Sequence, residues 1–105
     1  MSLEKLQRFE EAKALFRKTI PVARRVLGDS DDLTLKMRWI YAMELCNDPD
    51  TTLDDIREAV TTLEETERIA RRVLGSSHPR TQDLEETLQE ARACFLRARE
   101  ELGLA

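Results

Sequence analysis

The sequence repeats part of itself, and an internal repeat constrains the fold of a 105-residue chain more than any other feature. Residues 23–28, Ala-Arg-Arg-Val-Leu-Gly, recur letter for letter at 70–75, a shift of 47 residues. Further matches at this shift are Phe9 with Ile56, Ala12 with Ala59, Phe16 with Leu63 and Thr34 with Thr81. We therefore expect a single domain spanning 1–105 that contains two related units, near 9–34 and 56–81.

Apolar residues recur at steps of three and four along most of the chain, which is the spacing of one face of a helix. Gly and Pro number only three each, and most of the remaining residues are good helix formers. A glycine follows the periodic stretch at positions 28, 75 and 103, where helices commonly end. The sequence predicts an all-α fold of four antiparallel helices without strands, near 3–27, 33–46, 53–74 and 80–102.

Three features refine this prediction. Pro21 lies inside the first helix and removes a backbone donor, so we expect a kink near 17–20 rather than a break, because the apolar pattern continues beyond it. The helix near 33–46 is apolar on nearly every side and should lie between neighbours. The first and last helices each carry one apolar stripe, so we expect them to cap the stack with polar outer sides.

The charge, the cysteines and the absence of long apolar runs argue against a nucleic-acid-binding, secreted or membrane protein. A net charge of −4 argues against a nucleic-acid binder. Residues 1–28 hold seven Lys or Arg, which we expect mostly on a solvated helix face. Cys46 and Cys94 show no paired spacing and indicate small buried residues of a reducing, cytoplasmic protein. Without a signal peptide or an apolar run near ~18 residues, we expect neither secretion nor membrane insertion.

No motif for catalysis or for metal binding is recognisable. His78, the only histidine, precedes Pro79 and reads as a turn residue rather than a metal ligand. Paired acids such as 64–65 are expected on solvated faces. Trp39 and Tyr41 could line a ligand groove, although on so apolar a helix core packing is the favoured interpretation. We expect no enzyme activity, no metal and no cofactor.

Two stretches resemble a tetratricopeptide repeat, in the long variety seen in kinesin light chains. Residues 8–12, Arg-Phe-Glu-Glu-Ala, are similar to the opening of that family's second helix. Residues 73–81, Val-Leu-Gly-Ser-Ser-His-Pro-Arg-Thr, are similar to its connection between repeats, and 26–34 is a diverged copy. The resemblance implies a short right-handed superhelix: the second helix of one repeat, one complete repeat, and the first helix of the next. The 47-residue shift exceeds the ~34 residues of the ordinary repeat.

The resemblance also implies a function. First helices of successive repeats line a concave face in this family, and here these are the predicted helices 33–46 and 80–102. The family's peptide-clamping Asn is replaced by Ile40 and Thr87. We expect an interaction module that binds a protein or peptide, acidic with an apolar anchor, while a self-assembling unit that forms homo-oligomers is the alternative. The exposed candidates for partner binding are Lys36, Arg38, Trp39, Ile40 and Thr87, with Arg17 and Lys18 adding positive potential.

Overall fold

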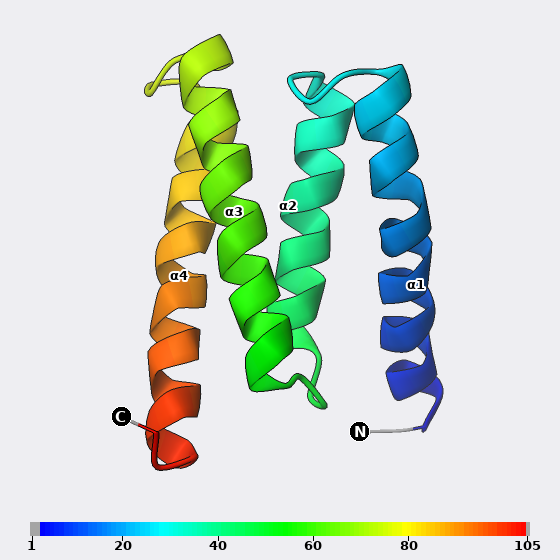
Figure 1. Cartoon of the computed structure of the whole chain (residues 1–105), viewed down its shortest axis with the longest axis vertical. Coiled ribbons are helices and arrows are strands. Elements are labelled where there is room, and N and C mark those ends of the chain that lie inside the picture. The colour runs from blue at the N-terminus through cyan, green and yellow to red at the C-terminus, as the bar shows by residue number, and fades with distance from the viewer. Residues whose placement is uncertain (1–2, 105) are drawn as a thin grey trace.

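The computed structural model describes residues 3–104, without the side chain of Leu6. These residues form four helices and no strand: α1 (Leu3–Val26), α2 (Asp32–Asn47), α3 (Leu53–Leu74) and α4 (Pro79–Glu101). The helices run alternately up and down and are joined by short turns (Figure 1). The predicted all-α fold is confirmed, and each predicted helix boundary agrees with the observed one to within one residue.

Residues in the turns end one helix and cap the N-terminus of the next. Gly28 and Gly75 have φ of +96° and +92°, a conformation that glycine adopts without strain, so both end a helix as predicted. Asp31 and Thr52 accept hydrogen bonds from backbone N–H groups of the following helix. His78 does the same for α4, because its Nδ1 accepts from the backbone N–H of Arg80 at 3.0 Å, which confirms it as a turn residue.

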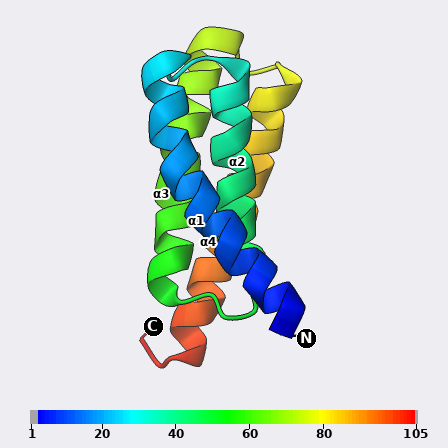
Figure 2. The ribbon, with the colours of Figure 1, turned by 90° about the vertical axis from the view of Figure 1, so that its right-hand side faces the viewer.

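Helix α2 occupies the middle of the stack. It contacts α1, α3 and α4, as its apolar composition predicts, and α3 packs in turn against α4 (Figures 1 and 2). Small residues let these helices approach closely: Ala42, Ala59 and Ala70 are completely buried. The larger side chains of the core are Leu35, Tyr41, Leu45, Leu63, Leu84 and Leu88.

Helix α1 is continuous through Pro21 and packs against α2 alone among the described helices. Its backbone does not approach α3, and side chains reach across instead. The Arg17 guanidinium donates to Tyr41 Oη at 2.9 Å and lies 3.4 Å from Glu58 of α3. The Arg24 guanidinium lies 3.3 Å from Glu65 of α3. Arg17 and Arg24 are nevertheless exposed, so the prediction that the basic residues of α1 mostly form a solvated face is confirmed, with Lys13 as the buried exception.

The most buried of these bridges joins Lys13 to Asp48 at the end of α2. Lys13 Nζ lies 2.7 Å from Asp48 Oδ2, and both side chains are almost completely buried. The hydrogen bond that Lys13 donates to Asp48 raises the pKa of Lys13 above its ordinary value against the opposing effect of burial. Burial alone would raise the pKa of Asp48, but the hydrogen bond from Lys13, the hydrogen bond from the backbone of Asp50 and the charge of Lys13 together outweigh it, and the net change is downward. Both groups are therefore charged at neutral pH.

The outer side of α1 differs from the prediction. A capping helix should be polar there, yet Leu15 is 63% exposed, Val22 is 44% exposed and Val26 is 71% exposed. The stripe that α1 turns toward α2 consists of other residues, including Phe16, Ile20 and Ala23. The expectation of a capped first helix is wrong, because α1 carries a second row of apolar residues that the first stripe obscured.

The substitution Ala59→Leu tests the close packing of α3. Ala59 has no exposed surface, so extra methyl groups must force the neighbouring helices apart. We expect a loss of about 1 to 3 kcal/mol in the free energy of unfolding, measured by urea denaturation. Ala14→Leu, at an exposed position of α1, is the matched control and should change little. Equal stability of Ala59→Leu and the unmodified protein would contradict this packing.

The substitution Lys13→Met tests the buried ion pair. It leaves Asp48 buried without its cation, so we expect a loss of about 3 kcal/mol in unfolding free energy near neutral pH. Adding Asp48→Asn to Lys13→Met removes the unpaired charge and should recover more than half of that loss. Failure of the double variant to recover would show that Lys13 acts through packing alone.

The same pair predicts a dependence on pH. The folded pKa of Asp48 lies below its ordinary value of 3.8, so its contribution to stability is complete above about pH 4 and is lost as the pH falls through the folded pKa. In Lys13→Met, burial without the cation raises that pKa instead. The difference in unfolding free energy between the two proteins should therefore be smaller near pH 3 than near pH 7. A constant difference would assign the stability to other groups.

Candidate functional site

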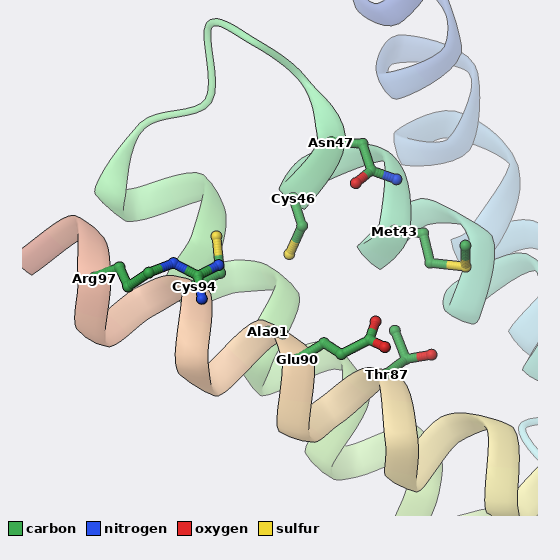
Figure 3. A pocket seen from close by; sticks show the side chains of 8 residues that line it. All are labelled: Met43, Cys46, Asn47, Thr87, Glu90, Ala91, Cys94 and Arg97. Carbon is green, nitrogen blue, oxygen red and sulfur yellow. The ribbon is translucent and has the colours of Figure 1, made fainter.

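A groove of about 340 Å³ lies between α2 and α4, and we call it the α2–α4 groove. Figure 3 shows Cys46 of α2 pointing toward α4, with Glu90 and Cys94 of α4 on the opposite wall. Its lining residues are Met43, Cys46, Asn47, Thr87, Glu90, Ala91, Cys94 and Arg97.

The 47-residue repeat relates the lining residues of α2 to those of α4. Met43 and Asn47 lie one turn apart on α2, and the 47-residue shift places them on Glu90 and Cys94 of α4. The two walls are therefore equivalent sides of two related helices. Both helices point the same way in the stack, because one helix lies between them in the chain (Figure 1).

The groove combines an apolar floor with polar groups at its edges. Met43, Cys46, Ala91 and Cys94 supply soft or apolar surface, while Asn47 offers an amide that can both donate and accept. Arg97 is exposed at one end, and the structure shows no ion pair for it within residues 3–104. Such a site can hold an apolar side chain and hydrogen-bond the backbone next to it.

The two cysteines are free and half-buried. Burial, followed by the neighbouring Cys94 and Glu90, raises the pKa of the Cys46 thiol to about 11. Their predicted role as small buried residues is thus only partly correct, because both contribute to the wall of an open groove rather than to the core.

Three of the predicted site residues lie along this side of the stack. Thr87 lines the groove itself. Trp39 is half-buried, and its indole N–H donates to Thr87 Oγ1 at 2.9 Å. The same Thr87 hydroxyl donates to the backbone carbonyl of Asp83, so its donor is already used within α4. Ile40 is half-buried in the middle of α2, one turn before Met43, and does not line the groove itself.

The guanidinium of Arg80, on α4, lies over the indole ring of Trp39. The Arg80 guanidinium lies 5.6 Å from the centre of the indole ring and 3.2 Å from Asp32. Lys36 is exposed. The arrangement fixes the ring of Trp39 next to the groove and leaves Lys36 accessible to a partner.

Arg38 is the exception among the predicted residues, because the expectation that it is exposed is wrong. Its side chain is almost completely buried, and its guanidinium lies 3.0 Å from Glu65 on α3. A helix turns about 100° per residue, so position 38 points roughly 200° away from position 36. Arg38 therefore contacts α3 and lies away from the α2–α4 groove.

Most lining residues were not identified from the sequence. Met43 and Asn47 follow Ile40 at steps of three and four, and Glu90, Cys94 and Arg97 follow Thr87 in the same way. The same helical spacing, continued from the clamp positions Ile40 and Thr87 toward the ends of their helices, identifies these lining residues in the sequence.

The comparisons with known proteins bear on the first unit. A family model described as tetratricopeptide repeat matches residues 1–32, which cover α1 and the turn after it. The match supports a TPR-type repeat protein. No curated protein and no solved structure matches the chain.

The described residues offer neither a membrane-spanning helix nor a cluster of metal ligands. No helix within residues 3–104 has the length and apolar composition that crossing a bilayer requires. Over the same range, no three His, Cys, Asp or Glu side chains lie close enough together to hold a metal ion.

The raised pKa of Cys46 predicts slow alkylation. In a Cys94→Ser variant, iodoacetamide should modify Cys46 near neutral pH about a hundredfold more slowly than an exposed thiol, because the thiolate fraction is small. The rate should rise about tenfold per pH unit up to about pH 10, as followed by mass spectrometry. A rate that levels off near pH 9 would contradict the burial of this thiol, and Cys46→Ser serves as the control for reaction elsewhere.

Proposed function

We propose that this chain is a non-catalytic protein-interaction module of the long tetratricopeptide type, and that it binds a peptide or partner helix in the α2–α4 groove. The observation that carries the proposal is the groove itself, an open cavity with an apolar floor between the two helices that correspond to the inner helices of a repeat array. The family match and the 47-residue repeat support the type of module. The free cysteines support a reducing compartment, which we take to be the cytoplasm.

The chemistry of the groove indicates the kind of segment that fits. An apolar side chain of the partner packs against Met43, Cys46 and Ala91, where it removes apolar surface from water. Asn47 takes the place of the missing clamp, because its amide can donate to a partner carbonyl and accept from a partner N–H. This role falls to Asn47 rather than Thr87, whose hydroxyl already binds Trp39 and Asp83.

The positive charges of Arg97 and Lys36 favour a partner segment that carries acidic residues. Arg97 is exposed at one end of the groove and Lys36 is exposed further along α2. An acidic residue on either side of the apolar anchor meets one of them, while Glu90 in the wall disfavours an acid at the anchor itself. The proposed partner segment therefore has an apolar centre and acidic ends.

A displayed library of random peptides tests this function. We expect selection against the unmodified protein to enrich peptides with an apolar anchor flanked by acids. Binding of a selected peptide, measured by fluorescence anisotropy, should weaken about tenfold in Arg97→Glu, which is about 1.4 kcal/mol. It should be lost in Met43→Glu, because that change places a carboxylate in the floor of the groove.

The control is Arg68→Glu, the same charge reversal at an exposed position of α3 outside the groove. It changes the net charge of the protein as Arg97→Glu does but should leave peptide affinity unchanged. Enrichment of peptides whose binding responds equally to both reversals would refute the groove as the site.

A further inference from the structure

The outer side of α1 is a second surface, separate from the groove, and the repeat shows what covers its counterpart. The 47-residue shift places four residues of α1 on four residues of α3 that face α2. We call these four residues of α1 the outer stripe: Glu11, Leu15, Lys18 and Val22. Their counterparts on α3 are Glu58, Thr62, Glu65 and Ile69.

The counterparts on α3 are half-buried in contacts with α2, and Glu58 and Glu65 also meet Arg17 and Arg24 of α1. Glu65 lies 3.0 Å from Arg38 of α2, Glu58 accepts a hydrogen bond from Tyr41 of α2, and Ile69 packs against the core. Every residue of the outer stripe, by contrast, is exposed. The reason is topological, because α3 has a helix on each of two sides whereas α1 packs against α2 alone among the described helices.

Adjacent positions show that α1 has the local geometry of α3. Thr66 donates its hydroxyl to the carbonyl of Thr62 at 2.6 Å, and Thr19, its counterpart, donates to the carbonyl of Leu15 at 2.7 Å. Thr66 is completely buried and Thr19 is half-buried. The same helix surface is therefore closed in one unit and open in the other.

The outer stripe is more apolar than the covered surface of α3 and carries the opposite charge at its centre. Leu15 stands where α3 has Thr62, and 63% of Leu15 is exposed. Lys18 stands where α3 has Glu65, the partner of Arg38. A helix packed on α1 as α2 packs on α3 would place the residue equivalent to Arg38 next to Lys18, so that residue must be an acid.

We propose that the outer stripe of α1 docks an amphipathic helix of a partner protein, in the position that α2 takes against α3. The partner helix presents apolar residues to Leu15 and Val22 and an acidic residue to Lys18. A second copy of this chain fits less well. Its α4 has Glu85 in the place of Arg38, but Gln82 and Gln89 stand where α2 has Leu35 and Ala42. Those amides leave the apolar part of the stripe without a matching surface.

The probe is a synthetic helical peptide copied from residues 32–47 of α2, with Arg38→Glu and Cys46→Ser. Its binding to the full chain is measured by fluorescence anisotropy. We expect it to bind at least about tenfold more tightly than the same peptide that keeps Arg38. The substitution Lys18→Glu should reverse this preference, and Leu15→Ser should weaken binding of both peptides.

The controls separate this surface from the groove. Lys18 and Leu15 are exposed, so both variants should keep the far-ultraviolet circular dichroism of the unmodified protein. Arg97→Glu, which alters the groove, should not change the affinity of either peptide. Equal affinity for the two peptides, or a preference that Lys18→Glu leaves unchanged, would overturn the proposal.

Sedimentation velocity at increasing protein concentration tests the competing occupant. We expect no association that depends on Lys18. Association that is lost in Lys18→Glu and restored by adding Glu85→Lys would show a second copy on the stripe, and would overturn the assignment to a partner protein.

Discussion

The ion pairs between α1 and the rest of the stack determine how this molecule is arranged. Helix α1 does not touch α3 through its backbone, yet Lys13, Arg17 and Arg24 project from one side of it and meet acids at the end of α2 and along α3. Only the Lys13–Asp48 pair is buried, so the remaining bridges are half-exposed and individually weak. The central helices are held by apolar packing, whereas α1 adds these charged bridges to the apolar stripe that it packs against α2.

This orientation has a consequence for the surfaces that α1 leaves open. With its basic side turned toward α3 and Phe16, Ile20 and Ala23 turned toward α2, Leu15, Val22 and Val26 are left exposed. The duplicated units thus share a local structure but differ in their neighbours. The places where a neighbour is missing, the α2–α4 groove and the outer stripe of α1, are the two surfaces that we propose bind partners.

The sequence predicts the helices well because each boundary depends on residues close in the chain, such as Gly75 after α3 and His78 before α4. Periodicity also identifies α2 as the central helix. It does not show which side of a terminal helix faces its neighbour, so Lys13 was expected in solvent and Leu15 was not recognised as exposed. Arg38 was misplaced for a related reason, because burial of a charge depends on a distant partner, here Glu65, which no local pattern reveals.

Native-state hydrogen exchange at low and high ionic strength tests most directly whether the charged bridges hold α1 in place. We predict that the amides of α1 exchange through an opening that costs less free energy than the openings of α2, α3 and α4. Raising the salt from about 0.02 M to about 0.5 M should widen this gap by about 1 kcal/mol, because the half-exposed bridges are screened. If the amides of α1 instead exchange only with global unfolding at both salt concentrations, apolar packing alone holds α1 and the charged bridges do not.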